Sequence, residues 1–161
     1  LIIRGQIDAV LAAEAPIEEG LLAERVASSW GLQRITPRVI AHLRSFLDDI
    51  RSTKSGDGQR RFLWRTDQDP AKHAGFRLPP PGAGAVRAAD LIPAEEIANA
   101  AVAILRDQIR MDRQSLAREL GRVFGFSRMG ARVEAAMEDG VDLLIRAGRV
   151  ILCGDSVSLP S

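Results

Sequence analysis

The side chains best suited to chemistry in this 161-residue sequence are two histidines, one cysteine and several carboxylates. His42 and His73 have no second histidine or cysteine at a metal-ligand spacing, and a zinc site needs about four ligands. We therefore expect no metal and no cofactor. Because Cys153 is the only cysteine, an intramolecular disulfide is impossible, and a reducing, cytoplasmic setting is expected. We expect Cys153 to be a small buried residue of a strand.

Phosphate-binding and acid–base motifs are also missing from the sequence. Gly82-Ala83-Gly84 follows no expected strand and lacks the third glycine of a dinucleotide-binding turn. Carboxylate pairs occur at four places, most of them near expected helix ends or on solvent faces: Glu18-Glu19, Asp48-Asp49, Glu95-Glu96 and Glu138-Asp139. A solvated surface explains these pairs better than catalysis does. We expect that this sequence is not itself an enzyme.

Basic side chains are the remaining functional candidates. The sequence has 22 basic and 21 acidic residues, and its net charge of +1 does not indicate a strongly basic nucleic-acid binder. A total can hide a local patch, so the positions of the arginines matter more than their number. The longest apolar run, Ala100–Leu105, is too short to span a bilayer, and no membrane association is expected.

The sequence contains an internal repeat. Residues 3–50 align without a gap with residues 97–144, a shift of 94 positions, and eleven of the aligned positions are identical. The clearest match sets Trp30–Val39 against Phe124–Val133, and it keeps one glycine and two arginines at the same places. Two copies of one small domain explain this pattern better than one large domain.

Each copy predicts three helices followed by a β-hairpin. In copy one, helical spacing of apolar residues predicts a first helix, then a second with Leu22, Val26 and Trp30 facing inward. Glu18-Glu19 favours the start of that second helix, and Gly31 its end. The third helix starts at Thr36-Pro37 and has an inward face of Val39, Leu43, Leu47 and Ile50. Asp57-Gly58 before Phe62–Trp64 then predicts the hairpin.

The residues of copy two predict the same three helices and hairpin. Asp112 caps the second helix, and 150–159 form a tight hairpin. The expected fold is mainly α with small β-hairpin wings, as tandem winged helix-turn-helix domains over 1–66 and 94–161. The proline- and glycine-rich segment 67–93 is expected to be an extended linker, and it could also pack across both domains. Because the sequence opens at Leu1 without an initiator methionine, we expect a fragment of a longer chain.

Copy one carries basic residues on the elements that touch DNA in a helix-turn-helix. There the third helix enters the major groove, and the wing can contact phosphate. The planar fork of arginine pairs with guanine or phosphate through two hydrogen bonds. The expected DNA-binding residues lie in the turn, on the third helix and beside the wing: Arg34, Arg38, His42, Arg44, Lys54, Arg60 and Arg61.

Copy two is the weaker candidate. It keeps Arg128 and Arg132, but the same helix carries carboxylates that repel a phosphate backbone: Glu134, Glu138, Asp139 and Asp142. Residues 1–66 carry ten basic and eight acidic side chains, a net +2, whereas residues 94–161 carry nine and ten, a net −1. One alternative stays open for arginines shared by both copies, namely that they cap the preceding helix or pair with a carboxylate.

Several motifs together resemble a known family: Leu22–Val26, Trp30-Gly31 with Arg34 and Arg38, Phe62–Trp64, Ile92–Ile97, Phe124–Arg128, Gly130–Arg132 and Gly148–Val150. The chain resembles a bacterial domain of unknown function found near the C-terminus of very large proteins similar to superfamily I helicases. Many of those proteins also carry a restriction-endonuclease-like domain. The resemblance implies an accessory module of an ATP-driven nucleic-acid machine, and it assigns no activity to particular residues.

Two functional hypotheses follow. The first is a non-catalytic module that docks duplex or forked DNA beside the helicase-like remainder of the parent chain, mainly through copy one. The second is a protein-interaction or dimerisation scaffold without direct DNA contact, favoured by the near-neutral charge and the acidic third helix of copy two.

Overall fold

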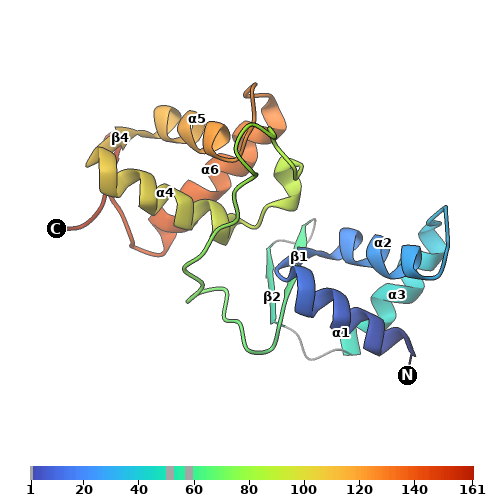
Figure 1. Ribbon diagram of the computed structural model, residues 1–161. Coiled ribbons are helices and arrows are strands. Elements are labelled where there is room, and N and C mark those ends of the chain that lie inside the picture. The colour runs from blue at the N-terminus through green and yellow to red at the C-terminus, as the bar shows by residue number, and fades with distance from the viewer. Residues whose placement is uncertain (1, 50–52, 57–59) are drawn as a thin grey trace. The chain divides into compact units, whose positions relative to one another are not determined.

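The computed structural model describes residues 2–49, 53–56 and 60–161. The chain is mainly helical with small antiparallel strand pairs, and it forms two compact units, Leu1–Lys72 and His73–Ser161 (Figure 1). None of the helices in this described part has the length and apolar content needed to cross a membrane.

The two units have the same order of helices and strands. In the first unit the elements are α1 (Ile2–Glu14), β1 (Ile17–Glu18), α2 (Glu19–Ser29), α3 (Pro37–Asp49), β2 (Thr53–Gly56) and β3 (Arg61–Trp64). In the second unit a short 3-10 helix, η1 (Ala89–Leu91), precedes α4 (Ala94–Gln108), β4 (Arg110–Asp112), α5 (Arg113–Val123), α6 (Ala131–Arg146), β5 (Ile151–Cys153) and β6 (Ser156–Ser158).

Each unit has a three-stranded antiparallel sheet whose last strand is central. β3 lies between β1 and β2, and β6 lies between β4 and β5. Ile17 pairs with Leu63, and Met111 pairs with Val157, so both partners are shifted by the same 94 positions as the helices. The hairpins were predicted, but the added strands β1 and β4 were not, because two or three residues are too few to show an alternating pattern.

Equivalent residues begin and end the second helix of each unit. The carboxylates of Glu18 and Asp112 each accept a hydrogen bond from the backbone N–H three residues later, at 2.9 Å. Such caps satisfy an N–H that has no partner inside the helix. Beyond the far ends, Gly31 and Gly125 have φ of +73° and +91°, a left-handed conformation that favours glycine. The predicted starts of α2 and α5, and the predicted stop of α2 at Gly31, are confirmed.

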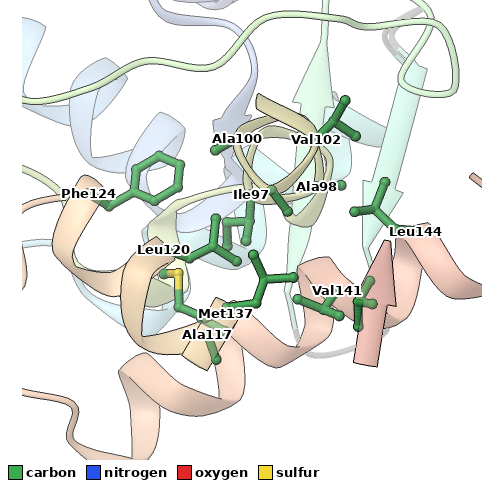
Figure 2. Close-up of a cluster of buried hydrophobic side chains, with 14 of the residues drawn as sticks. Ile97, Ala98, Ala100, Val102, Ala117, Leu120, Phe124, Met137, Val141 and Leu144 are labelled. Atoms are coloured by element: carbon green, nitrogen blue, oxygen red, sulfur yellow. The ribbon is translucent and has the colours of Figure 1, made fainter. Parts of the chain in front are cut away.

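The same positions of the repeat are buried in both units. The matched pairs, each at most 1% exposed, are Leu22 with Leu116, Leu43 with Met137, and Leu63 with Val157. In the second unit they belong to a core formed by α4, α5 and α6 (Figure 2). Full burial of one such side chain stabilises a fold by roughly 1.5–3 kcal/mol, so these positions explain why the apolar pattern recurs.

Two expectations about burial are wrong. Trp30 was expected to face inward, but it is 37% exposed just after α2, where the indole Nε1 donates a hydrogen bond to Gln6 Oε1 of α1. Cys153 was expected to be buried, but it is exposed on β5, the outer strand of its sheet. The predicted positions of Ile50 and of the turn at Asp57-Gly58 lie outside the described residues.

The segment expected as a linker is largely part of the second unit, which begins at His73. Phe76 packs against the second core, and Ala89 and Ile92 are buried within it. Polar contacts hold the segment as well, since Asn99 Nδ2 donates to the backbone oxygens of His73 and Gly75 at 2.8 and 2.9 Å. The proline and glycine content predicted an extended linker, whereas these contacts pack the segment against the second unit.

Candidate nucleic-acid interface

Two unpaired arginines lie at the turn between α2 and α3 of the first unit. Arg34 is in the turn and Arg38 is on the first turn of α3, and both side chains are exposed. Neither guanidinium has an ion pair or a hydrogen bond with any described residue. A free guanidinium keeps all its donors for an external anion, and phosphate is the anion that its planar fork fits well.

An apolar groove of about 480 Å³ lies beside Arg38. It is bounded by the end of α2, the turn and the first half of α3, and its lining residues are Trp30, Leu32, Thr36, Arg38, Val39, His42 and Leu43. Trp30 and Leu32 are 37% and 41% exposed, which leaves large apolar surface open to solvent. The His42 ring meets Phe46 edge-on, with centroids 5.0 Å apart, and this contact orients the imidazole at the groove.

The sequence did not predict this groove, because Trp30 was assigned to the core. The helix end alone gives no signal for it, since Phe124 also precedes a glycine of positive φ and is 2% exposed. Arg38 and His42 were predicted as binding residues, and the structure brings both to the groove.

Two other predicted binding residues are occupied by carboxylates. Glu19, whose side chain is only 9% exposed, lies 3.0 Å from Arg44 Nε and 3.0 Å from Arg61 Nε. Arg61 Nη2 also donates a hydrogen bond to Asp48 Oδ1 at 3.1 Å. These pairs join β3 and α3 to the first turn of α2, so the placement of Arg44 and Arg61 favours a structural role.

The remaining two predicted residues are not brought to the groove lining. Lys54 lies in β2, and its side chain is outside the described part of the structure. Arg60 precedes β3, is half-buried and already interacts with other residues. The candidate interface of the first unit therefore consists of Arg34, Arg38 and His42.

The corresponding arginines of the second unit are also exposed. Neither Arg128 nor Arg132 has an ion pair or hydrogen bond with the residues that the structure describes, and the same is true of Arg34 and Arg38. The described contacts therefore give no support to the alternative that these arginines cap helices or pair with carboxylates. What differs is the helix that follows, because α6 carries exposed Glu134, Glu138 and Asp139.

Three of the four charged positions in the first unit's ion-pair cluster carry the opposite charge in the second unit. Glu19, Arg44 and Arg61 correspond at the 94-residue shift to Arg113, Glu138 and Asp155. Asp48 is kept as Asp142, and there it accepts a hydrogen bond from Arg113. Each unit thus links the first turn of its second helix to its third helix, with the basic partner drawn from a different element.

Metal ligands and buried carboxylates are the other groups that could take part in chemistry. In the described part of the chain, no three His, Cys, Asp or Glu side chains gather as ligands for a metal ion. The buried carboxylates Glu19 and Glu96 both pair with arginines. The groove and the arginines near it present apolar surface and positive charge to solvent.

Comparison with known proteins identifies part of the first unit. Residues 2–41 match a family described as "Protein of unknown function (DUF3320)". The match covers α1, α2 and the start of α3, including the groove residues up to Val39. No curated protein and no solved structure matches the chain. The first part of the chain is thus similar to a domain of unknown function.

Proposed function

We propose that the chain is a non-catalytic accessory module that binds nucleic acid, and that its two units are tandem winged helices. The single observation that carries this proposal is the pair of exposed, unpaired guanidiniums of Arg34 and Arg38 at the turn before α3. In a helix-turn-helix, this turn and the first residues of the following helix face the DNA. The element order of each unit, with three helices and a hairpin, supports that comparison.

The first unit makes the contacts, mainly to phosphate. Arg34 and Arg38 neutralise backbone charge, and His42 lies one helical turn after Arg38 on α3. The second unit contributes less, because Glu134, Glu138 and Asp139 of α6 repel phosphate beside Arg128 and Arg132. Duplex or forked DNA is the proposed ligand, and the helicase- or nuclease-like remainder of a parent chain, implied by the resemblance, is the proposed cytoplasmic partner.

Fluorescence anisotropy with labelled duplex, forked and single-stranded DNA tests the proposal. About two or three phosphate contacts predict that log K falls with log salt concentration with a slope of roughly −2 to −3 on duplex DNA. Binding at about 50 mM salt that weakens with this slope supports the proposal. Absence of binding to all three DNAs at low salt would contradict it.

A second candidate function rests on the acidic face of α6. Glu134, Glu138 and Asp139 are exposed there, and such a face suits a basic protein partner or a second copy of the chain. Light scattering on the chain and a pull-down with purified parent protein test this scaffold function. A monomer with clear DNA affinity and no parent-protein binding excludes it.

A further inference from the structure

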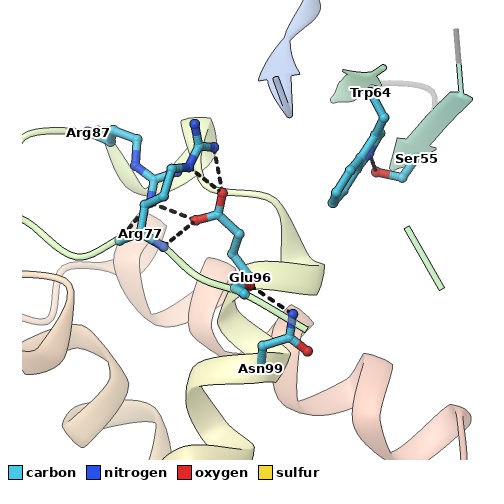
Figure 3. Close-up of polar contacts among 7 residues, drawn as sticks. Ser55, Trp64, Arg77, Arg87, Glu96 and Asn99 are labelled. Carbon is cyan, nitrogen blue, oxygen red and sulfur yellow. Dashed lines mark hydrogen bonds and ion pairs between the residues drawn. The ribbon is translucent and has the colours of Figure 1, made fainter. Parts of the chain in front are cut away.

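A segment of the second unit that forms neither helix nor strand, and that turns at Pro80–Ala83, is held at both ends by one carboxylate. Residues 77–87, here called the strap, start and finish with arginines that bind Glu96, a residue that is 0% exposed on the first turn of α4. Arg77 Nε and Arg87 Nη2 each donate a hydrogen bond to Glu96 at 2.8 Å (Figure 3). Between these ends, residues 79–86 carry no charged side chain.

The strap lies against the turn that follows α5. A Cβ atom placed on Gly125 would be 2.6 Å from the backbone N of Ala85 and 2.6 Å from the backbone C of Gly84. Only a glycine permits so close an approach. Phe124, just before this turn, is 2% exposed. In the second unit, therefore, a glycine- and alanine-containing segment covers the end of the second helix.

The first unit keeps this place but leaves it open. Gly31 corresponds to Gly125, and a Cβ there would meet no atom of the described residues within 4 Å. Trp30 corresponds to Phe124, and it is 37% exposed at the edge of the groove of about 480 Å³. The residues that anchor the strap and the segment just before it have no equivalent in the first unit, since Ile2 and Gly5 stand where the second unit has Glu96 and Asn99.

We infer that the groove beside Gly31 is a docking site for an uncharged segment of a partner protein, rich in proline, glycine and alanine. Such a segment would cross the turn after α2 as the strap crosses the turn after α5. It would bury Trp30 and Leu32, and proline would lower the entropy lost on binding. The inference rests on the surroundings of Gly31 and Trp30 and not on the proposed DNA contacts, although Arg38 and His42 line the same groove.

The equivalent turns also decide between a peptide and a nucleobase as the occupant. Arginines stand at the same two positions beside both turns, Arg34 and Arg38 in the first unit and Arg128 and Arg132 in the second. In the second unit the turn after α5, which precedes these arginines, is nevertheless covered by the neutral backbone of the strap. The neighbouring charges therefore do not require an anionic occupant, and the precedent within the molecule is a peptide segment.

The test uses the full 161-residue chain with Trp64→Phe, which leaves Trp30 as the only tryptophan. The probe is a synthetic peptide with the sequence of residues 79–86, PPPGAGAV, capped at both ends and titrated to about 1 mM. We expect saturable binding with a dissociation constant on the order of 10⁻⁴ M and a blue shift of Trp30 emission as the indole loses solvent.

Two matched variants locate the binding. Gly31→Asn keeps a residue that tolerates the left-handed backbone, φ +73°, and puts a side chain where the segment must pass. Gly148→Asn makes the same change at φ +66° in open space of the second unit. We expect Gly31→Asn to weaken binding at least tenfold and Gly148→Asn to leave it unchanged, while melting temperatures show that both variants fold.

Three outcomes overturn the inference. The first is the absence of any shift up to about 1 mM peptide. The second is binding that survives Gly31→Asn. The third is a shift of Trp30 emission with oligothymidine but not with the peptide, which would make the groove a base-binding site instead.

Discussion

Arg61 lies with its Nε 3.0 Å from the carboxylate of Glu19, and this pair ties β3 to the first turn of α2. In the second unit the same two positions hold Asp155 and Arg113, so the charges are exchanged while the helices and strands keep their order. In each unit an ion pair joins the first turn of the second helix to the third helix, Glu19 with Arg44 and Arg113 with Asp142, and these pairs serve the fold of each unit. Arg61 therefore has a structural role that Arg34 and Arg38 do not share, although all three are basic.

Arg61→Ala should lower stability. The change leaves Glu19, only 9% exposed, with Arg44 as its remaining ion-pair partner among the described residues, and we expect a loss of about 1–3 kcal/mol in the free energy of unfolding. Both tryptophans lie in the first unit, so urea unfolding followed by tryptophan emission measures this unit. Arg34→Ala, an exposed and unpaired control, should change stability by less than about 0.5 kcal/mol. Equal stability of the two variants would refute the structural role of Arg61.

Glu96 should make the second unit sensitive to acid. Burial opposes ionisation of this carboxyl, but the hydrogen bonds and charges of Arg87 and Arg77 outweigh it and hold its pKa below the ordinary value. A lowered folded-state pKa adds stability above the unfolded value of about 4.3, and that stability is lost as the pH falls through the folded value. Amide hydrogen exchange of α5 and α6, measured between about pH 3 and pH 7, should show this loss.

Glu96→Gln should remove that acid dependence. The variant leaves two arginines without their shared charge, and we expect it to destabilise the second unit by about 3 kcal/mol near pH 7. Its stability should then change less than that of the parent chain as the pH falls. An unaltered acid profile in the variant would show that other carboxylates govern acid unfolding.

Gly125 and Gly31 should respond differently to the same substitution. Both have positive φ, so alanine strains either site by about 1 kcal/mol. At Gly125 the new methyl group would also meet strap backbone at 2.6 Å, and we expect a total cost of about 2–3 kcal/mol with exposure of the strap. Thermal unfolding and limited proteolysis within 77–87 compare the variants. Equal costs at the two glycines would argue against the packed strap.

The two tryptophans should differ in their access to a small quencher. Trp30 is 37% exposed, whereas Trp64 is 0% exposed and donates from Nε1 to Ser55 Oγ at 2.9 Å. Acrylamide should quench the Trp64→Phe variant strongly and the Trp30→Phe variant weakly. Similar quenching constants for both variants would contradict the open groove beside α2.

Much of the fold could be predicted from the sequence because the repeat supplied each pattern twice. Leu22 and Leu43 recur as Leu116 and Met137, and the buried stripes follow from helical spacing alone. The pairing of Ile17 with Leu63 could not be predicted, since it joins a two-residue strand to a strand far along the chain. The path of residues 73–93 was equally hidden, because it depends on a buried carboxylate, Glu96, that looked like half of a surface pair.

The candidate site was predicted only in part, for a similar reason. Residue type and position in the sequence predicted that Arg34 lies in the turn before α3 and that Arg38 and His42 lie on α3, and the structure places them there. The same criteria selected Arg44 and Arg61, whose carboxylate partner Glu19 is distant from Arg61 in sequence and close in space. Pairing of this kind depends on tertiary structure, and spacing along one helix or strand does not reveal it.

The double variant Arg34→Ala/Arg38→Ala, compared with Arg128→Ala/Arg132→Ala, tests the proposed DNA contacts most directly. The two variants remove the same charges from equivalent, unpaired positions of the two units, so their net charges and expected stabilities match. In duplex DNA anisotropy at low salt, the first variant should lose affinity at least tenfold and its salt slope should become shallower by about 2, with little change in the second. Equal losses in both variants, or no loss in the first, would contradict binding through the first unit.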